Sequence, residues 1–128
     1  MAHAATPQRP RPVVSSLQRL DAYRLSLLLA ATVDSLVPRG HSALRDQLDR
    51  AASSVSLCVA EGFGRWQTRE KAHLYSVAHG SALEVRAVID VLAARELAST
   101  EQCEAARALA TRVARVIEAL VLSVRRRL

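Results

Sequence analysis

The chain has 128 residues, of which half are apolar and only 3% are aromatic. This length corresponds to about one domain with a single core. Four glycines and four prolines are too few for a turn-rich all-β protein, and two cysteines are too few for a disulfide framework. The formal net charge of +6 favours anionic partners such as nucleic acid or a membrane surface. The same charge also fits a protein that uses arginine only for solubility.

Residues 1–14 are expected to form a tail. Pro7, Pro10 and Pro12 alternate with Arg9 and Arg11, a pattern that favours extended backbone and excludes helix. The segment lacks the apolar centre of a signal peptide. The longest unbroken apolar run of the chain, Leu27–Ala31, is far shorter than the ~20 residues that cross a bilayer. We therefore expect a cytoplasmic protein that does not enter membranes, with one domain over residues 15–128.

The first helix is predicted from about Ser16 to Leu36. Ser15 to Gln18 fits a capping box, and Pro38 to Gly40 ends the pattern. Apolar residues cover roughly twice the usual ~100° stripe of the helical wheel. A second apolar face is typical of a subunit interface, although a deep central helix explains it too. The residues predicted to contact another copy of the chain are Leu25, Leu28, Leu29 and Leu36.

Three further helices follow from apolar residues spaced by four and three. Ser42 is predicted to cap the second helix and Thr68 the third, while Ser99 and Gln102 form a second capping box before the fourth. The second helix is expected to end at Gly62 and Gly64. Its apolar stripe is Leu44, Leu48, Ala51, Val55, Cys58 and Gly62. The stripes of the third and fourth helices are Leu74, Ala78, Ser81, Val85, Val88 and Leu92, and Ala106, Leu109, Val113, Val116, Leu120 and Val124.

These segments predict an all-α protein, an antiparallel up-down-up-down four-helix bundle with a shallow crossing angle of about 20°. Gly80 lies in the middle of the third helix, where glycine costs ~1 kcal/mol relative to alanine. We expect a close approach of the second and third helices to compensate for that cost.

Two sequence blocks carry a resemblance to a known family. Gln47, Arg50 and Ser54 precede the run Ala60-Glu61-Gly62-Phe63-Gly64-Arg65, and the second block is Ala78 to Glu84, with Gly80 and Ser81 inside it. Together they resemble the bacterial four-helix-bundle family of the 23S rRNA intervening-sequence proteins, from about Leu17 to Leu122. The residues that match the family motif are Gln47, Arg50, Ser54, Glu61, Gly62, Gly64, Arg65, Gly80, Ser81 and Glu84.

The resemblance implies a small bundle that assembles as a ring-like homopentamer. The chain is also distantly similar in fold to the accessory protein of diversity-generating retroelements. This similarity implies RNA, DNA or a reverse transcriptase as partners. This chain departs from the family pattern in four places. Ser56 and Cys58 stand where the family usually has Pro and Asn, Leu74 replaces an aromatic residue, and His79 replaces Arg.

Candidate enzymatic and metal sites are incomplete. A di-metal bundle needs two Glu-x-x-His pairs, but Glu70 and His73 are the only such pair, so no metal or cofactor is expected. Glu61 and Glu84 allow an acid/base pair lining a cleft. The sequence favours a structural role, in which they close helix ends or meet Arg50 or Arg65 across a subunit contact, because no other catalytic residue converges on them. We predict that the protein is not an enzyme and takes no small-molecule substrate.

The predicted topology gathers basic residues at one end of the bundle. Arg9, Arg11 and Arg125–Arg127 supply +5 of the net charge, whereas residues 13–124 carry thirteen basic and twelve acidic side chains. Trp66 lies within this end and is suited to stack on a base. Alternatively, Trp66 packs under its turn and the C-terminal arginines only complement the helix dipole. The predicted nucleic-acid-binding residues are Arg65, Trp66, Arg69, Lys71, Arg125, Arg126 and Arg127.

The sequence therefore predicts a non-enzymatic oligomeric protein that binds nucleic acid through a basic pole, with a nucleic-acid enzyme as a candidate partner. The alternative is a protein-interaction scaffold that does not bind nucleic acid. Steep salt dependence of nucleic-acid binding distinguishes the two.

Overall fold

The structure, a computed structural model, describes Leu17 and residues 20–128. The predicted tail with Arg9 and Arg11, and the capping box from Ser15 to Gln18, lie outside the described residues. Four helices follow in chain order: α2 (Asp21–Val33), α3 (Ser42–Gly64), α4 (Thr68–Ala94) and α5 (Thr100–Arg125). Over the described positions there is no strand. The all-α prediction is thereby confirmed.

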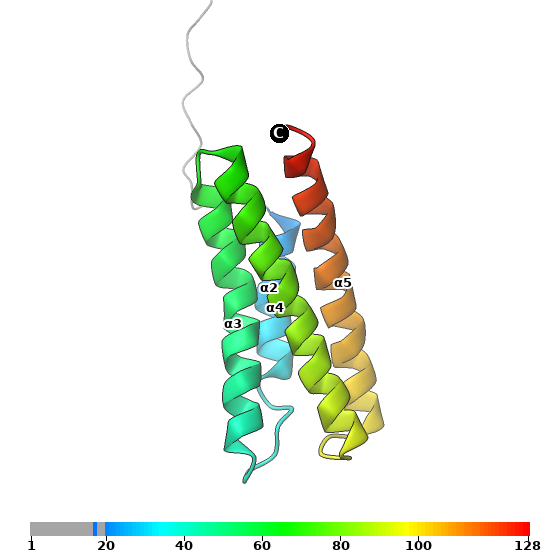
Figure 1. The fold of residues 1–128 in the computed structure, drawn as a ribbon. Coiled ribbons are helices and arrows are strands. Elements are labelled where there is room, and N and C mark those ends of the chain that lie inside the picture. The colour runs from blue at the N-terminus through cyan, green and yellow to red at the C-terminus, as the bar shows by residue number, and fades with distance from the viewer. Residues whose placement is uncertain (1–16, 18–19) are drawn as a thin grey trace, which may run out of the picture.

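The helices form an antiparallel four-helix bundle (Figure 1). In the described chain α2 contacts α3 and α5, and α4 contacts the same two helices, but α2 and α4 do not meet. The two therefore lie at opposite corners of the bundle, with α2 behind α4 in Figure 1. The turn between α3 and α4 lies at the same end as the C-terminus. This is the predicted up-down-up-down arrangement.

The core consists mainly of valine and alanine. Val55, Val85 and Val113 are fully buried, and so are Ile89 and Leu92. Burying a side chain of this size stabilises the fold by about 1.5–3 kcal/mol. Alanines fill the positions between them, which lets neighbouring helices approach closely.

The first predicted helix is shorter than expected at both ends. Leu20 has extended backbone (φ −76°, ψ 118°) immediately before α2. The prediction of one continuous helix from Ser16 to Leu36 was therefore wrong. At the other end α2 stops at Val33, and the amide of Leu36 bonds the carbonyl of Val33 in a tighter turn. Val37 precedes Pro38, and a residue before proline avoids helical backbone. The chain therefore leaves the helix before this proline.

The leucines predicted to contact another copy differ in their exposure. Leu29 and Leu36 are buried in the core of the chain itself, so they are not available as an intersubunit surface. Leu25 is half-buried, and Leu28 is 53% exposed. Leu27, not predicted at this surface, is 46% exposed. The outward apolar face of α2 is therefore narrower than the sequence indicates.

One predicted cap is confirmed and two are wrong. The Ser99 side chain accepts a hydrogen bond from the Gln102 amide, and the Gln102 side chain bonds back to the Ser99 amide. Ser42 and Thr68, in contrast, are the first helical residues of α3 and α4. The capping positions belong to His41 and Gln67, and neither makes a side-chain cap bond. Ser42 and Thr68 thus lie one residue beyond the capping position, so their hydroxyls do not cap the helices.

The two helical glycines have unlike surroundings. A β-carbon built on Gly80 would meet no atom within 4 Å, so the expected close approach of α3 and α4 at Gly80 was wrong. A β-carbon on Gly62 would lie 2.8 Å from Cε1 of Tyr75. The tight contact between α3 and α4 is therefore at Gly62, close to the turn that joins them.

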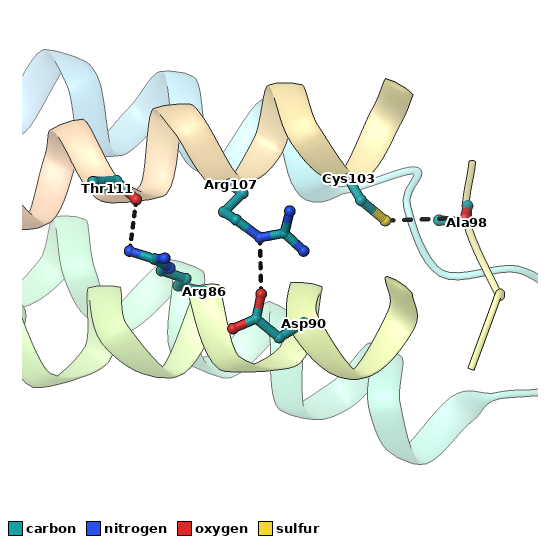
Figure 2. Close-up of polar contacts among 6 residues, drawn as sticks. All are labelled: Arg86, Asp90, Ala98, Cys103, Arg107 and Thr111. Atoms are coloured by element: carbon teal, nitrogen blue, oxygen red, sulfur yellow. Dashed lines mark hydrogen bonds and ion pairs between the residues drawn. The ribbon is translucent and has the colours of Figure 1, made fainter. Parts of the chain in front are cut away.

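Polar side chains tie α4 to α5 along the outside of the bundle. Arg107 Nε donates to Asp90 Oδ1 at 2.8 Å, and Arg86 donates to the Thr111 hydroxyl at 3.0 Å (Figure 2). Exposed pairs of this kind contribute about 0–1 kcal/mol each. Their main value is that they fix the register of the two helices.

Candidate nucleic-acid interface

Six cationic side chains lie at the end of the bundle where the α3–α4 turn meets the C-terminus. Arg65 and Arg69 flank the turn, Lys71 lies in the first turn of α4, and Arg125–Arg127 end the chain. We call this end, with Trp66, the basic pole. Among the described residues of the pole, the acids are Glu61 and Glu70. The pole therefore carries an excess of positive charge on a bundle that is otherwise close to neutral.

Trp66 is the most exposed large hydrophobic side chain in the described part of the chain. It lies in the turn between α3 and α4 and is 97% exposed. The alternative in which Trp66 packs under its turn is therefore wrong. Next to it, a shallow hollow is lined by Arg65, Arg69 and His73 together with the acids Glu61 and Glu70, and its apolar wall includes Leu74. A solvent-exposed indole between two arginines is a combination suited to stacking on a nucleobase and pairing with its phosphates.

Lys71 is occupied with holding the end of α3. Its Nζ donates to the carbonyls of Gly62 at 3.0 Å and Phe63 at 2.8 Å, and it lies 5.7 Å from the centre of the Phe63 ring. These carbonyls belong to the last turn of α3, where a helix offers no amide partners. The pKa of Lys71 is lowered, first by burial and second by the charge of Arg127. Lys71 was predicted to bind nucleic acid, but its ammonium already has two partners.

The C-terminal arginines lie over the start of α4. Arg125 bonds the Ser76 hydroxyl at 3.4 Å. The charge of Arg127 acts on both Lys71 and Tyr75: burial raises the pKa of Tyr75 to about 12, and Arg127 opposes that rise. Arg126 and Arg127 are exposed. The chain end and the α3–α4 turn, far apart in sequence, therefore form one cationic surface.

Arg65 forms an ion pair with Glu61 one turn earlier, with 2.9 Å between Nη2 and Oε2. Both side chains are about half exposed, so the pair is weak and a stronger anion such as phosphate competes for the guanidinium. This contact is within one chain, whereas the sequence suggested one across subunits.

Glu61 and Glu84 do not form a catalytic pair. The Ser54 and Ser81 hydroxyls bond at 2.9 Å, which sets the register of the antiparallel helices α3 and α4. In that register Glu61 is level with Leu74, about ten residues, or ~15 Å, along the bundle from Glu84. The cleft lined by both carboxylates is therefore absent. Within the part of the chain that the structure describes, no group of three or more potential metal ligands occurs, and Glu70 and His73 stand without further ligands.

The residues of the family motif divide into two groups. Gly62 supports the packing of Tyr75, and Ser54 with Ser81 links α3 to α4, with Cys58 Sγ at 3.6 Å from the Ser54 hydroxyl. The second group is exposed on α3, α4 and the turn between them. It consists of Gln47, Arg50, Gly64, Gly80 and Glu84, together with Glu61 and Arg65, which form the ion pair described above.

At the positions that depart from the family pattern, the substituted side chains are accommodated locally. Ser56 is buried and donates to the Ser53 carbonyl at 3.2 Å. His79 Nε2 lies 3.6 Å from a carboxylate oxygen of Glu118. His79 can therefore make the same kind of ion pair as an arginine, but only when it is protonated.

Comparisons with known proteins agree with this architecture. The family model of the 23S rRNA-intervening sequence protein matches residues 18–119, which confirms the resemblance found in the sequence. A solved structure of a protein of unknown function from the S23 ribosomal protein family of Bacteroides thetaiotaomicron superposes with a TM-score of 0.64 at 16% identity. The match covers 86% of this chain and 98% of that one, and at this identity it establishes the fold. No curated protein matches the chain.

Over the described residues, no helix is long and apolar enough to cross a membrane.

Proposed function

Because the chain belongs to the family of 23S rRNA-intervening sequence proteins, we propose that it is a non-enzymatic, oligomeric protein that binds RNA through its basic pole. The observation that carries the proposal is the 97% exposure of Trp66 between Arg65 and Arg69. A bundle of this size has room to bury one indole, and leaving it in water gives up the stabilisation that burial would provide. An exposed aromatic ring beside cations is the pattern of single-strand binding proteins.

Single-stranded RNA suits this surface better than a duplex. The bases of a duplex are stacked on one another, so an exposed ring reaches unpaired bases in loops, bulges and ends. The arginines at the chain end would neutralise phosphates on either side of the stacked base. We therefore expect recognition of unpaired RNA with little sequence preference, in the cytoplasm.

Assembly would strengthen such binding. Leu27 and Leu28 are exposed on α2, and the family suggests a ring, for which we expect five copies. A ring would repeat the basic pole on one of its faces, so that one RNA contacts several poles. Linked contacts raise the overall affinity without any new interaction.

The experiment is a fluorescence-anisotropy titration of a labelled single-stranded RNA at several salt concentrations. The test variant replaces Arg125, Arg126 and Arg127 with glutamine. The control variant loses the same charge at exposed sites away from the pole, by Arg39→Gln, Arg95→Gln and Arg112→Gln. Three lost phosphate contacts should reduce the slope of log K against log salt by about 2 in the test variant only. Equal slopes in the test variant and the unmodified chain, or equal losses in both variants, would remove the proposed site. The same titration with DNA of equal sequence shows whether the pole distinguishes the two.

A further inference from the structure

The hollow beside the exposed indole combines acidic and basic side chains. Arg65 and Gln67, the two neighbours of Trp66 in the turn, both line it, and so do the carboxylates of Glu61 and Glu70. Its volume is about 440 Å³, which is in the range of sites that bind small molecules. A strand that stacks one base on Trp66 therefore has its next base within reach of the hollow.

The acids of the hollow oppose the charge of the pole, because a carboxylate repels the phosphates of a nucleic acid. Glu61 is already neutralised, since its Oε2 lies 2.9 Å from Nη2 of Arg65. Glu70 forms no ion pair within the described part of the chain, and it lies exposed in the first turn of α4. Its two oxygens are therefore left to accept hydrogen bonds from a ligand.

Guanine is the RNA base that best matches a free carboxylate. Unpaired bases expose their Watson–Crick edges to a protein. On the guanine edge, N1–H and the N2 amino group are adjacent donors, and they match the two oxygens of one carboxylate. Adenine, cytosine and uracil each place a donor beside an acceptor, so the second oxygen would face a lone pair. Hydrogen bonds to an ionised acceptor are also stronger than bonds between neutral groups.

The cations of the hollow suit guanine as well. Arg69 precedes Glu70 in the chain, and both side chains line the hollow. Guanine carries the acceptors O6 and N7 beside N1–H, and arginine is the commonest partner of these two atoms. Adenine has an amino group in place of O6 and would turn a donor toward the guanidinium. The imidazole of His73 and the apolar wall at Leu74 offer surface to the face of the base.

We propose that this hollow is a guanine subsite of the RNA interface, in which Glu70 accepts hydrogen bonds from N1–H and the N2 amino group of one unpaired guanine. The inference rests on the proposed function and adds a preference at a single nucleotide. Trp66 stacks on the neighbouring base, and stacking tolerates every base. The remainder of the strand is therefore bound without sequence preference.

The test compares short oligouridines that carry one central guanosine, inosine, adenosine or cytidine. Each competes with a labelled oligouridine for the full chain in a fluorescence-anisotropy assay. The guanosine oligonucleotide should bind about tenfold more tightly than the adenosine one, near the lower end for a bidentate pair because the hollow is open to water. Inosine lacks the N2 amino group, so its oligonucleotide should bind with intermediate affinity.

Two variants with the same chemical change separate base recognition from charge. In Glu70→Gln the amide has one acceptor oxygen and turns its NH2 group toward the second donor of guanine, so the guanosine preference should be lost. Glu61→Gln is the matched control, because it alters the carboxylate that Arg65 holds in the same hollow. It should keep the preference and raise the affinity for all four oligonucleotides alike, since Arg65 becomes free to bind phosphate. Trp66→Ala should weaken all four and also keep the preference.

Several outcomes would overturn the guanine subsite and leave RNA binding in place. They are equal affinities of the unmodified chain for the four oligonucleotides, a guanosine preference that persists in Glu70→Gln, and a preference lost in Glu61→Gln instead. An acid that only repels phosphate or stabilises the start of α4 would give the second outcome. If no oligonucleotide bound, the proposed function would fail together with the subsite. Circular dichroism checks that each variant is helical, and Glu70→Ala replaces Glu70→Gln if that variant does not fold.

Discussion

Gly62 of α3 lies directly against the aromatic ring of Tyr75 of α4: a β-carbon on the glycine would be 2.8 Å from Cε1 and 2.9 Å from Cδ1 of the ring. Tyr75 is almost fully buried, so the ring has little room to withdraw. The contact lies just below the basic pole and holds the ends of α3 and α4 together. It therefore positions the turn that carries Trp66.

Gly62→Ala should destabilise the bundle. Overpacking a filled site costs about 1–3 kcal/mol, which exceeds the ~1 kcal/mol that alanine gains over glycine in a helix. We expect a lower free energy of unfolding in urea, measured by circular dichroism. Gly80→Ala is the control, since that site is open, and it should stabilise the dissociated chain. Equal shifts in the two variants would show that packing against Tyr75 has no effect.

Lys71→Met should reduce stability more than it reduces RNA binding. The substitution keeps the apolar stem but removes the two bonds to the Gly62 and Phe63 carbonyls, at a cost of about 1–2 kcal/mol. Arg69→Met, at an exposed neighbour, should change stability by less than about 0.5 kcal/mol and weaken RNA binding instead. Urea unfolding and RNA anisotropy on both variants check this. If both variants unfolded at the same urea concentration, Lys71 would not be acting as the α3 cap.

Tyr75→Phe should remove a loss of stability at high pH. Burial raises the pKa of Tyr75 from 10.0 to about 12 in the folded chain. Between these values the unfolded tyrosine ionises while the folded one keeps its proton, so the unfolded state binds fewer protons and the free energy of unfolding falls as pH rises. The stabilising contribution of the shielded phenol is fully present below pH 10, and its loss approaches about 2–3 kcal/mol, the order expected for two pKa units, by about pH 12.

Urea unfolding between pH 8 and 11.5 measures this effect. Groups common to both proteins, including Lys71, cancel when Tyr75→Phe is compared with the unmodified chain. The difference in stability between the two should change above pH 10. Parallel curves throughout would mean that the phenol is not shielded from water.

The four-helix bundle was predictable because apolar residues at three and four specify both helices and their buried sides. Helix ends were less predictable. Ser42 and Thr68 are of the type that caps helices, but the type alone does not distinguish a capping residue from the first helical one. Leu20 fits the apolar pattern, so its extended backbone leaves no signal in the sequence.

The basic pole was predictable in outline because topology alone brings the α3–α4 turn to the C-terminus. Its details depended on three-dimensional contacts. The role of Lys71 requires a turn that folds back over nine residues onto Gly62. The exposure of Trp66 depends on how that turn directs one side chain, and the sequence allowed both outcomes.

Fluorescence of Trp66 tests the central claim most directly. It is the only tryptophan of the chain and is exposed in the middle of the basic pole, so its emission reports stacking at that site alone. Titration with unlabelled single-stranded RNA should quench the emission to saturation, at a midpoint that moves to higher RNA concentration as salt increases. In the variant with glutamine at positions 125–127, the midpoint should be higher at low salt and depend less on salt. RNA that binds by anisotropy without changing Trp66 emission, or RNA that does not bind at all, would contradict the proposed interface.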